Sequence, residues 1–158
     1  MKVAIDSDDC GVELKKVILE HLRSQLVEVE DLDLIGSREV DYPDVGYNLA
    51  KRVSNKEFDR GILICGTGLG MAMIANKVEG VYAGVCHDVY SAERLSKSND
   101  ANVLTMGARV IGPELAKSVV SAWIKSEFQG GASSRKVSRM RDLEKAERMA
   151  SKVAEHRQ

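Results

Sequence analysis

The sequence predicts an α/β fold built on a five-stranded parallel sheet. Five short β-like segments alternate with helical segments along the chain, and the links between them are short. The last three of these β-like segments are continuously apolar, which is typical of strands that helices cover on both faces. Alternation of this kind favours parallel strands joined by right-handed helical crossovers.

The first half of the chain is expected to hold two strands and two helices. A strand is predicted at 2–7, and apolar residues at helical spacing predict a helix over 12–26. Residues 27–35 alternate between apolar and polar, which indicates a strand with one exposed face. A proline near the start and a one-sided apolar stripe predict a helix over 41–55.

The second half continues the alternation with three strands, each followed by a helix. The strands are predicted at 60–65, 80–86 and 102–107. The helices are predicted at 68–78, 89–98 and 112–128. The first of these helices has a glycine-rich entry, and the last begins with a proline, which suits the first turn of a helix.

Residues 129–158 differ from the rest of the chain. After Gly130-Gly131 a highly charged helix is expected, with a narrow apolar stripe made of Val137, Met140, Leu143, Ala146 and Met149. A helix this polar cannot enter a core, so it is expected to pack across a neighbouring subunit through a small seam, or to fray. We predict one domain over 1–158, with 129–158 as a C-terminal extension helix.

Length, charge and hydropathy exclude several classes of protein. The 158 residues fit one domain with its own core. The formal net charge of −1 gives no general attraction to nucleic acid or to an anionic membrane. No apolar stretch approaches the ~18 residues of a transmembrane helix, and Met1 runs straight into the first predicted strand with no signal segment before it. We therefore expect a cytoplasmic protein.

The cysteines and histidines are few and scattered. The three cysteines are Cys10, Cys65 and Cys86. Their odd number and wide spacing argue against a disulfide framework and against a zinc site. Of the three histidines, His21 lies in a charged helical segment and His156 in the C-terminal tail, which leaves His87 as the candidate catalytic imidazole.

The predicted topology locates the functional site. In an open parallel sheet, ligands bind beyond the carboxyl ends of the strands. In this chain the rule selects 6–11, 65–70, 86–91 and 107–109. These segments hold most of the unusual cysteine, glycine and polar residues, so we expect the site at this edge.

Cys65 ends the third predicted strand and is followed by a glycine-rich turn and a helix start. Free N–H groups and a partial positive charge at such a start can hold an anion, and the same field favours a thiolate. The segment is neither a Walker loop nor a dinucleotide fingerprint. Spacing alone leaves a reactive thiol and a buried filler equally open, since free cysteines are among the most buried residue types.

Three carboxylates surround the end of the first predicted strand, namely those of Asp6, Asp8 and Asp9. Paired acids can bind a divalent metal or orient sugar hydroxyls. Helix capping by Asp8 or Asp9 is the simpler interpretation for at least one of them. No further carboxylate or histidine cluster supports a metal, so neither a metal nor another cofactor is expected.

Cations near the same edge indicate a small anionic substrate. Arg109 follows the fifth predicted strand, and a guanidinium there would suit a phosphate. Arg135 and Lys136 add two cations after the double glycine, although cations on a polar tail are usually only solubilising. Asp88 is expected to cap the helix after the fourth strand, with Ser91 three residues on.

Three segments carry a resemblance to a known family. "ILICGTGLGMAMIANK" (62–77), "HDVYSAERLSKSNDANVLTMGARVIGPELAK" (87–117) and "DYPDVG" (41–46) resemble the ribose-5-phosphate isomerase B and galactose-6-phosphate isomerase family. The likeness extends from "KVAIDSDD" to "FQGG". It implies a Rossmann-like three-layer α/β sandwich, no metal, and aldose–ketose isomerisation of a sugar phosphate. It also implies a homodimer or tetramer with active sites shared between subunits, and no nucleic-acid or membrane partner.

The resemblance further implies roles for individual residues. Cys65 matches the catalytic base that moves a proton between C1 and C2 of the open-chain sugar. The loop whose N–H groups stabilise the cis-enediolate matches Thr67 together with Gly66, Gly68 and Gly70. Asp8 and Tyr42 match residues that contact sugar hydroxyls. Asn99 matches a residue given to the neighbouring subunit's site, and Arg109 matches a phosphate ligand.

Three departures from the family pattern concern the substrate. The pattern has a histidine where this chain has Asp9, and another where it has Ser98. The second histidine usually helps to open the furanose ring, a step that a four-carbon sugar phosphate does not need because it cannot close that ring. After the double glycine, Ala132 replaces the first of two arginines, which leaves Arg135 and Lys136 near the second.

The departures leave the substrate open between two sugars. Asp9, Ser98 and "HD-x-YSAER" also resemble a subgroup that includes D-erythrulose-4-phosphate isomerases, so ribose 5-phosphate is the first expectation and D-erythrulose 4-phosphate the alternative. His87 could replace the missing acid, although a helix-entry histidine bonded to backbone is an equal alternative. A non-catalytic phosphosugar-binding module is the alternative from another class. A flavodoxin-like nucleotide module ranks last, because the chain lacks a convincing nucleotide loop.

Overall fold

The computed structural model describes residues 1–37 and 39–155 and has the predicted α/β fold. The strands are β1 (Lys2–Ser7), β2 (Glu28–Asp31), β3 (Arg60–Cys65), β4 (Ala83–Val85) and β5 (Val103–Gly107). They form one five-stranded sheet in the order β2-β1-β3-β5-β4, and every pairing in it is parallel. The sheet confirms the predicted strand number and direction.

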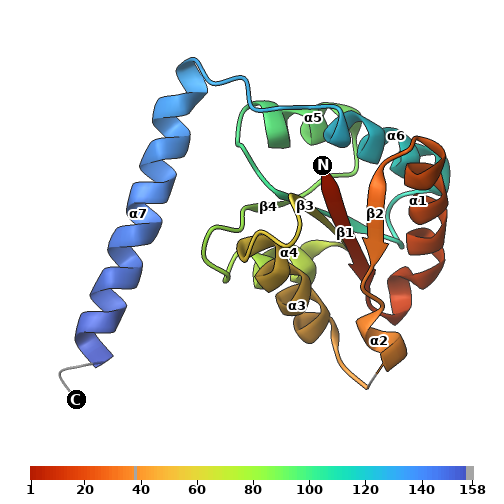
Figure 1. The fold of residues 1–158 in the computed structure, drawn as a ribbon, viewed down its shortest axis with the longest axis horizontal. Coiled ribbons are helices and arrows are strands. Elements are labelled where there is room, and N and C mark those ends of the chain that lie inside the picture. Colours follow the sequence, from red (N-terminus) through yellow and green to blue (C-terminus); the bar gives the residue numbers. More distant parts are fainter. Residues whose placement is uncertain (38, 156–158) are drawn as a thin grey trace.

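Helices cover both faces of the sheet and make a three-layer, Rossmann-like sandwich (Figure 1). One face is covered by α1 (Val12–Ser24), α5 (Val89–Lys97) and α6 (Pro113–Ile124), and the other by α3 (Tyr42–Ser54) and α4 (Leu69–Ala75). Each face has its own apolar core. Along β3, Ile62 and Ile64 enter the first core, whereas Leu63 and Cys65 enter the second. Because successive strand side chains alternate, the fold itself turns Cys65 toward the α3/α4 layer.

Two of the predicted strands are too long. The strand predicted at 27–35 ends at Asp31, and a short helix α2 (Leu34–Ser37) follows it. Asp33 has a left-handed φ of 42°, and the backbone N–H of Leu34 donates to the buried Asp6 carboxylate at 3.3 Å. The alternation in this segment therefore reflects apolar side chains that pack on the α3/α4 core rather than a continuing strand.

The fourth strand and the helix before it are also shorter than predicted. β4 pairs with β5 only from Ala83 to Val85, and Gly80 has a φ of 74° that an extended strand does not adopt. α4 covers Leu69–Ala75 of the predicted 68–78. A single 3-10 turn, η1 (Asp9–Gly11), links β1 to α1.

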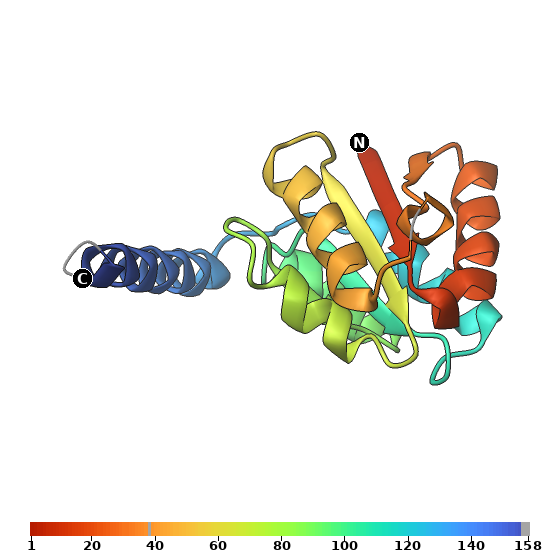
Figure 2. The same ribbon diagram turned by 90° about the horizontal axis from the view of Figure 1, so that it is seen from below.

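The C-terminal helix α7 (Ala132–Glu155) lies outside both helical layers, beyond the β4 edge of the sheet (Figures 1 and 2). Among its described side chains only Val137 is buried, which agrees with the prediction that this helix cannot enter the core. It touches its own chain through Arg141, paired with Asp100 at 2.5 Å, and through Glu144, which accepts from the Tyr82 hydroxyl at 2.7 Å.

The predicted C-terminal extension helix reaches residue 158. Residues 156–158, including His156, lie outside the described part of the chain. Across residues 1–37 and 39–155, no helix combines the length and the apolar character that crossing a membrane requires.

Candidate active site

The carboxyl ends of three neighbouring strands meet at one edge of the sheet. Ser7 of β1 pairs with Ile64 of β3, and Cys65 pairs with Gly107 of β5. The loops that follow these strands, with the first turn of α3, bring together most of the predicted site residues. They are Asp8, Asp9, Tyr42, Cys65, Gly66, Thr67, Gly68, Gly70 and Arg109, and His87 reaches the same edge from β4.

Cys65 is the last residue of β3 and its side chain is buried. Its Sγ accepts a hydrogen bond from the backbone N–H of Gly68 at 3.1 Å. Its carbonyl oxygen accepts from the N–H of Ala108 at 2.8 Å, which ties the end of β3 to the loop after β5. The sulfur is therefore held at a defined place in the glycine loop, on the side of the α3/α4 layer.

Two glycines allow the loops after β3 and β5 to pack backbone against backbone. Gly68 has a φ of 79°, and a β-carbon added there would lie 2.9 Å from the Met106 backbone. A β-carbon added at Gly107 would lie 2.5 Å from Cα of Thr67 and 2.8 Å from the carbonyl oxygen of Gly66. No other residue type fits either position without displacing backbone.

The loop is held from a third direction by a buried hydroxyl. Thr105 of β5 donates from its Oγ1 to the carbonyl oxygen of Gly68 at 2.9 Å. The sequence reasoning missed the supporting roles of Thr105 and Gly107. A glycine at the end of a buried strand, directly before "AR", was the available signal for Gly107.

Tyr42 and Thr67 lie at the outer side of the glycine loop. The Tyr42 ring packs on Gly70, where an added β-carbon would lie 2.5 Å from the ring. The Thr67 side chain is exposed, and its Oγ1 accepts from the N–H of Leu69 at 3.3 Å. That contact uses the oxygen as an acceptor, so the Thr67 O–H is left to donate to another group.

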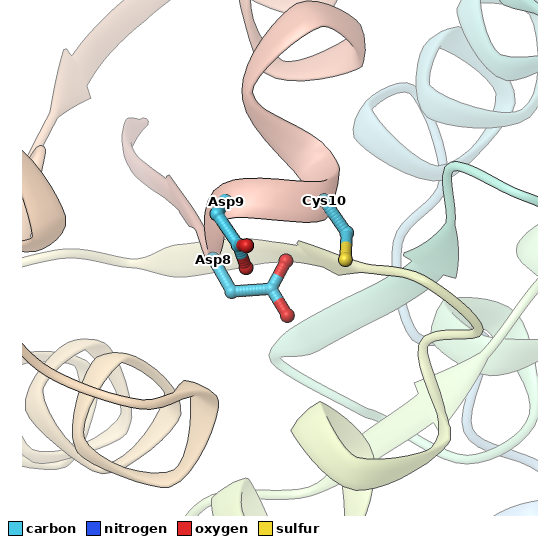
Figure 3. Close-up of side chains that lie close together, drawn as sticks. All are labelled: Asp8, Asp9 and Cys10. Carbon is cyan, nitrogen blue, oxygen red and sulfur yellow. The ribbon is translucent and has the colours of Figure 1, made fainter.

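The loop after β1 presents two carboxylates and a thiol. Asp8 caps the 3-10 turn η1, with its Oδ1 accepting from the N–H of Gly11 at 3.2 Å, whereas α1 itself begins after Gly11 without a side-chain cap. Figure 3 shows that the side chains of Asp8, Asp9 and Cys10 point toward one another, and their candidate ligand atoms lie within 4.8 Å of each other. Burial, reinforced by the Asp9 charge, raises the pKa of Asp8.

These three side chains are the one group in the described residues with the spacing of a metal site. The guanidinium of Arg109 donates to Cys10 Sγ at 3.2 Å, so a positive charge already lies against the group. Arg109 offsets one of the two carboxylate charges and already occupies the Cys10 sulfur, so the group suits a divalent cation less well than three unengaged ligands would. The group therefore fits the substrate-binding interpretation better than a metal centre.

Arg109 crosses the whole site edge. Its backbone N–H donates to the carbonyl oxygen of Gly66 at 3.0 Å. Its side chain runs over Gly66, where an added β-carbon would lie 3.5 Å from Nη1, and it ends at Cys10. Since β5 and β1 flank β3 in the sheet, this side chain spans three neighbouring strand ends.

His87 is bonded to backbone. Its Nε2 accepts from the N–H of Gly107 at 2.8 Å, which in a neutral ring leaves the proton on Nδ1. The ring thus supports the same close-packed loop, and only its Nδ1–H is left for a substrate. Asp88 caps α5 by accepting from the N–H of Ser91 at 2.7 Å, as predicted.

Four predicted site residues do not join this edge. Ser98, Asn99 and Lys136 line a separate pocket of about 270 Å³ between the end of α5 and the start of α7. Arg135 is exposed in the first turn of α7. The pocket lies near the start of β5, and the four residue steps from Val103 to Gly107 span about 13 Å. Within one chain, the predicted residues therefore form two groups at opposite edges of the sheet.

Comparison with known proteins gives a consistent set of matches. The sequence profile described as Ribose/Galactose Isomerase matches residues 3–140. Ribose-5-P isomerase B of Listeria innocua is 47% identical over 148 residues, which cover 94% of this chain and 100% of that protein. D-erythrulose-4-phosphate isomerase of Pectobacterium atrosepticum is 46% identical over 142 residues, or 89% of this chain and 93% of the relative.

A solved structure has the same fold. Ribose-5-phosphate isomerase B of Clostridium thermocellum superposes with a TM-score of 0.87 at 45% sequence identity. The match covers 92% of this chain and 99% of the solved chain.

Proposed function

The chain belongs to the ribose/galactose isomerase family, and from that premise we propose that it interconverts ribose 5-phosphate and ribulose 5-phosphate through a cis-enediolate. It is a sugar-phosphate isomerase. The observation that carries the proposed chemistry is the position of Cys65. Its sulfur lies at the end of a buried strand, 3.1 Å from a backbone N–H of a loop that glycines keep closely packed.

The reaction needs a base for a carbon-bound proton and donors for a growing negative charge. In the proposed mechanism the Cys65 thiolate takes the proton from C2 of the open-chain aldose, and the electron pair moves to the carbonyl oxygen O1. The proton on O2 then passes to O1, and Cys65 returns its proton to C1 to give the ketose. Backbone N–H groups of the 66–70 loop stabilise the enediolate between the two transfers.

The remaining groups at this edge suit the rest of the substrate. Arg109 offers a permanently charged fork to the phosphate. Asp8, Asp9 and Tyr42 are placed to contact hydroxyls, and the free O–H of Thr67 can donate to a substrate oxygen. His87 would act only through Nδ1–H, since Nε2 is occupied by the backbone of Gly107.

The four residues at the opposite edge lead us to propose a homodimer or tetramer with shared sites. Ser98, Asn99, Arg135 and Lys136 would be given to the site of a neighbouring subunit. Exposed apolar side chains on α4 and α7 support this assembly, with Met73 at 69% and Met149 at 57% exposed. Light scattering on the purified protein tests it. A cytoplasmic location is part of the same proposal.

D-erythrulose 4-phosphate is a second candidate substrate, favoured by a specific observation. The chain has Asp9 and Ser98 where ring-opening members of the family have histidines, and a relative named for that substrate is 46% identical. A four-carbon sugar phosphate needs no ring opening, so this chain would retain every group that its isomerisation requires.

A coupled assay of wild type and Cys65→Ala on both sugar phosphates tests the proposed function. Loss of a general base is expected to slow turnover by about 10²- to 10⁴-fold. Cys86→Ala is the matched control, because Cys86 is a buried thiol in the other core. This variant should turn over as fast as wild type. An intact protein inert on both sugars would favour the non-catalytic phosphosugar-binding alternative. An active Cys65→Ala variant would remove the base assignment alone.

Substrate choice has its own test. Ser98→His should raise turnover of ribose 5-phosphate, because it restores an acid for ring opening, and should leave D-erythrulose 4-phosphate unchanged. Ser98→Ala is the control for loss of the serine hydroxyl, which accepts from Arg94 at 3.3 Å. If the histidine variant shows no gain on the pentose, Ser98 does not set substrate choice.

A further inference from the structure

The guanidinium of Arg109 is held by a thiol. Its Nη2 donates to Sγ of Cys10 at 3.2 Å, and the side chain reaches that sulfur by lying across Gly66. Cys10 is half-buried, in contrast to the buried Cys65 and Cys86. It belongs to η1, which Asp8 caps and thereby fixes at the end of β1. The sulfur is therefore a stationary anchor at the far side of the site from the Arg109 backbone.

The backbone end of Arg109 is fixed as well. Its N–H donates to the carbonyl oxygen of Gly66 at 3.0 Å. The neighbouring Ala108 N–H donates to the carbonyl oxygen of Cys65 at 2.8 Å. The long side chain is thus restrained at both ends and in its middle, where Gly66 has no side chain to obstruct it. An arginine side chain that is free in solution carries about 2 kcal/mol of rotamer entropy, and these contacts remove part of that freedom before any ligand arrives.

The anchor leaves most of the guanidinium available. A guanidinium has five N–H donors, and the contact with Cys10 occupies one of them on Nη2. Sulfur is a weak acceptor, so this contact orients Arg109 without forming an ion pair. The neighbouring Asp8 carboxylate interacts with the same charge, since, against the raising effect of burial, Arg109 acts to lower the pKa of Asp8.

We propose that Cys10 is a positioning residue that presets Arg109 for the phosphate of the substrate. The proposal rests on the proposed function in one respect, because it gives the Arg109 guanidinium the role of phosphate ligand. Preorganisation of a binding group raises affinity by reducing what must be ordered on binding. Since the phosphate is remote from the reacting carbons, the effect should appear in KM rather than in kcat.

The first experiment measures binding of inorganic phosphate by calorimetry and requires no turnover. Cys10→Ala should weaken phosphate binding by about three- to fivefold, the factor expected for one weak hydrogen bond. Cys10→Ser restores an acceptor of smaller size and should bind within about twofold of wild type. Glu13→Gln changes an exposed neighbour at the start of α1 and should bind as wild type does.

A double-mutant cycle separates positioning from packing. Arg109→Lys keeps the charge but has no Nη2 to donate, so Cys10→Ala should have no further effect on phosphate binding in that background. Circular dichroism establishes that each variant is folded. In the isomerase assay, Cys10→Ala should raise KM by the same factor and leave kcat within about twofold.

Several results would overturn the proposal. The first two are that wild type does not bind phosphate, or that Cys10→Ala binds it as tightly as wild type. A third is that the alanine and serine variants lose the same amount of phosphate affinity. A fourth is that Cys10→Ala weakens binding just as much in the Arg109→Lys background. Failure of the proposed function looks different. A protein without isomerase activity that still shows the predicted binding pattern would keep the role of Cys10 and lose only the reaction.

Discussion

The two edges of the sheet that carry predicted site residues are built in different ways. The strand-end edge is formed by the loops that follow β1, β3 and β5. There, Gly68 and Gly107 let two backbone segments approach so closely that a single added carbon would overlap them. At the α5/α7 edge, Ser98, Asn99 and Lys136 line an open pocket beside a helix whose described side chains are almost all exposed. The first edge holds Cys65 and the glycine loop, whereas the second presents polar side chains with no cysteine or histidine among the residues that line its pocket. The proposed assembly accounts for this difference by giving the second edge to another subunit.

The largest effect is expected where backbones touch. Gly107→Ala places a β-carbon 2.5 Å from Thr67 Cα, which forces the β3 and β5 loops apart and displaces Cys65. We expect a loss of about 1–3 kcal/mol in the free energy of unfolding and a fall in turnover of about 10²-fold or more, since a 1 Å displacement can cost that much. Urea denaturation and the coupled assay measure the two quantities.

Gly112→Ala is the matched control for that variant. A β-carbon there would meet nothing within 4 Å, and the residue has an ordinary φ of −81°. Because Gly112 is the N-cap of α6, the variant should lower the free energy of unfolding by about 0.5–1 kcal/mol and leave turnover unchanged. If the two glycine variants behave alike, the close approach at Gly107 does not carry the site.

A pH effect is expected from the buried acid at the same edge. Burial raises the pKa of Asp6 to about 6, against the opposing effects of the N–H groups of Ser7 and Leu34 and of the Lys15 charge. The folded protein therefore holds this proton more tightly than the unfolded chain. Stability from this group is present at low pH and is lost as pH rises toward about 6.

Asp6→Asn should remove that dependence. Relative to wild type, the variant should be less destabilised at pH 8 than at pH 4.5, with a difference of about 2 kcal/mol. Thermal or urea unfolding at the two pH values measures it. A stability difference that does not change with pH would show that Asp6 titrates as an ordinary exposed acid.

The smallest effect is expected at the α7 contacts. Tyr82→Phe removes the hydroxyl that donates to Glu144 at 2.7 Å, and Arg141→Ala removes the ion pair with Asp100. Each should lower the free energy of unfolding of one chain by no more than about 1 kcal/mol, because exposed polar contacts contribute little. Urea denaturation with size-exclusion chromatography distinguishes a loss of stability from a change in assembly. A loss of several kcal/mol would mean that α7 is held mainly by its own chain.

The features that the sequence predicts are local, and those that it does not predict depend on contacts between distant residues. The strand order in sequence, the continuous apolar runs and the glycine-rich turn after Cys65 are local patterns, and they led to the sheet and to the site edge. The strand predicted over 27–35 is wrong beyond Asp31, because Asp33 has a left-handed φ and the Leu34 N–H donates to the Asp6 carboxylate. That hydrogen bond joins residues 28 positions apart, which a local pattern does not reveal. The contact of Arg109 with Cys10 joins residues 99 positions apart, and no spacing in the sequence indicates it. A backbone bond of His87 is one of the two alternatives that the sequence leaves open, and the fold identifies Gly107 as its partner.

In the proposed assembly one active site combines the strand-end edge of one chain with the α5/α7 edge of another, and subunit complementation is the direct test. Cys65→Ala and Asn99→Ala should each be poorly active alone. When the two are unfolded together and refolded, half of the dimers formed at random are mixed, and each mixed dimer has one site with both edges intact. Shared active sites therefore predict recovery of about a quarter of wild-type activity. A mixture no more active than its separate components would contradict it.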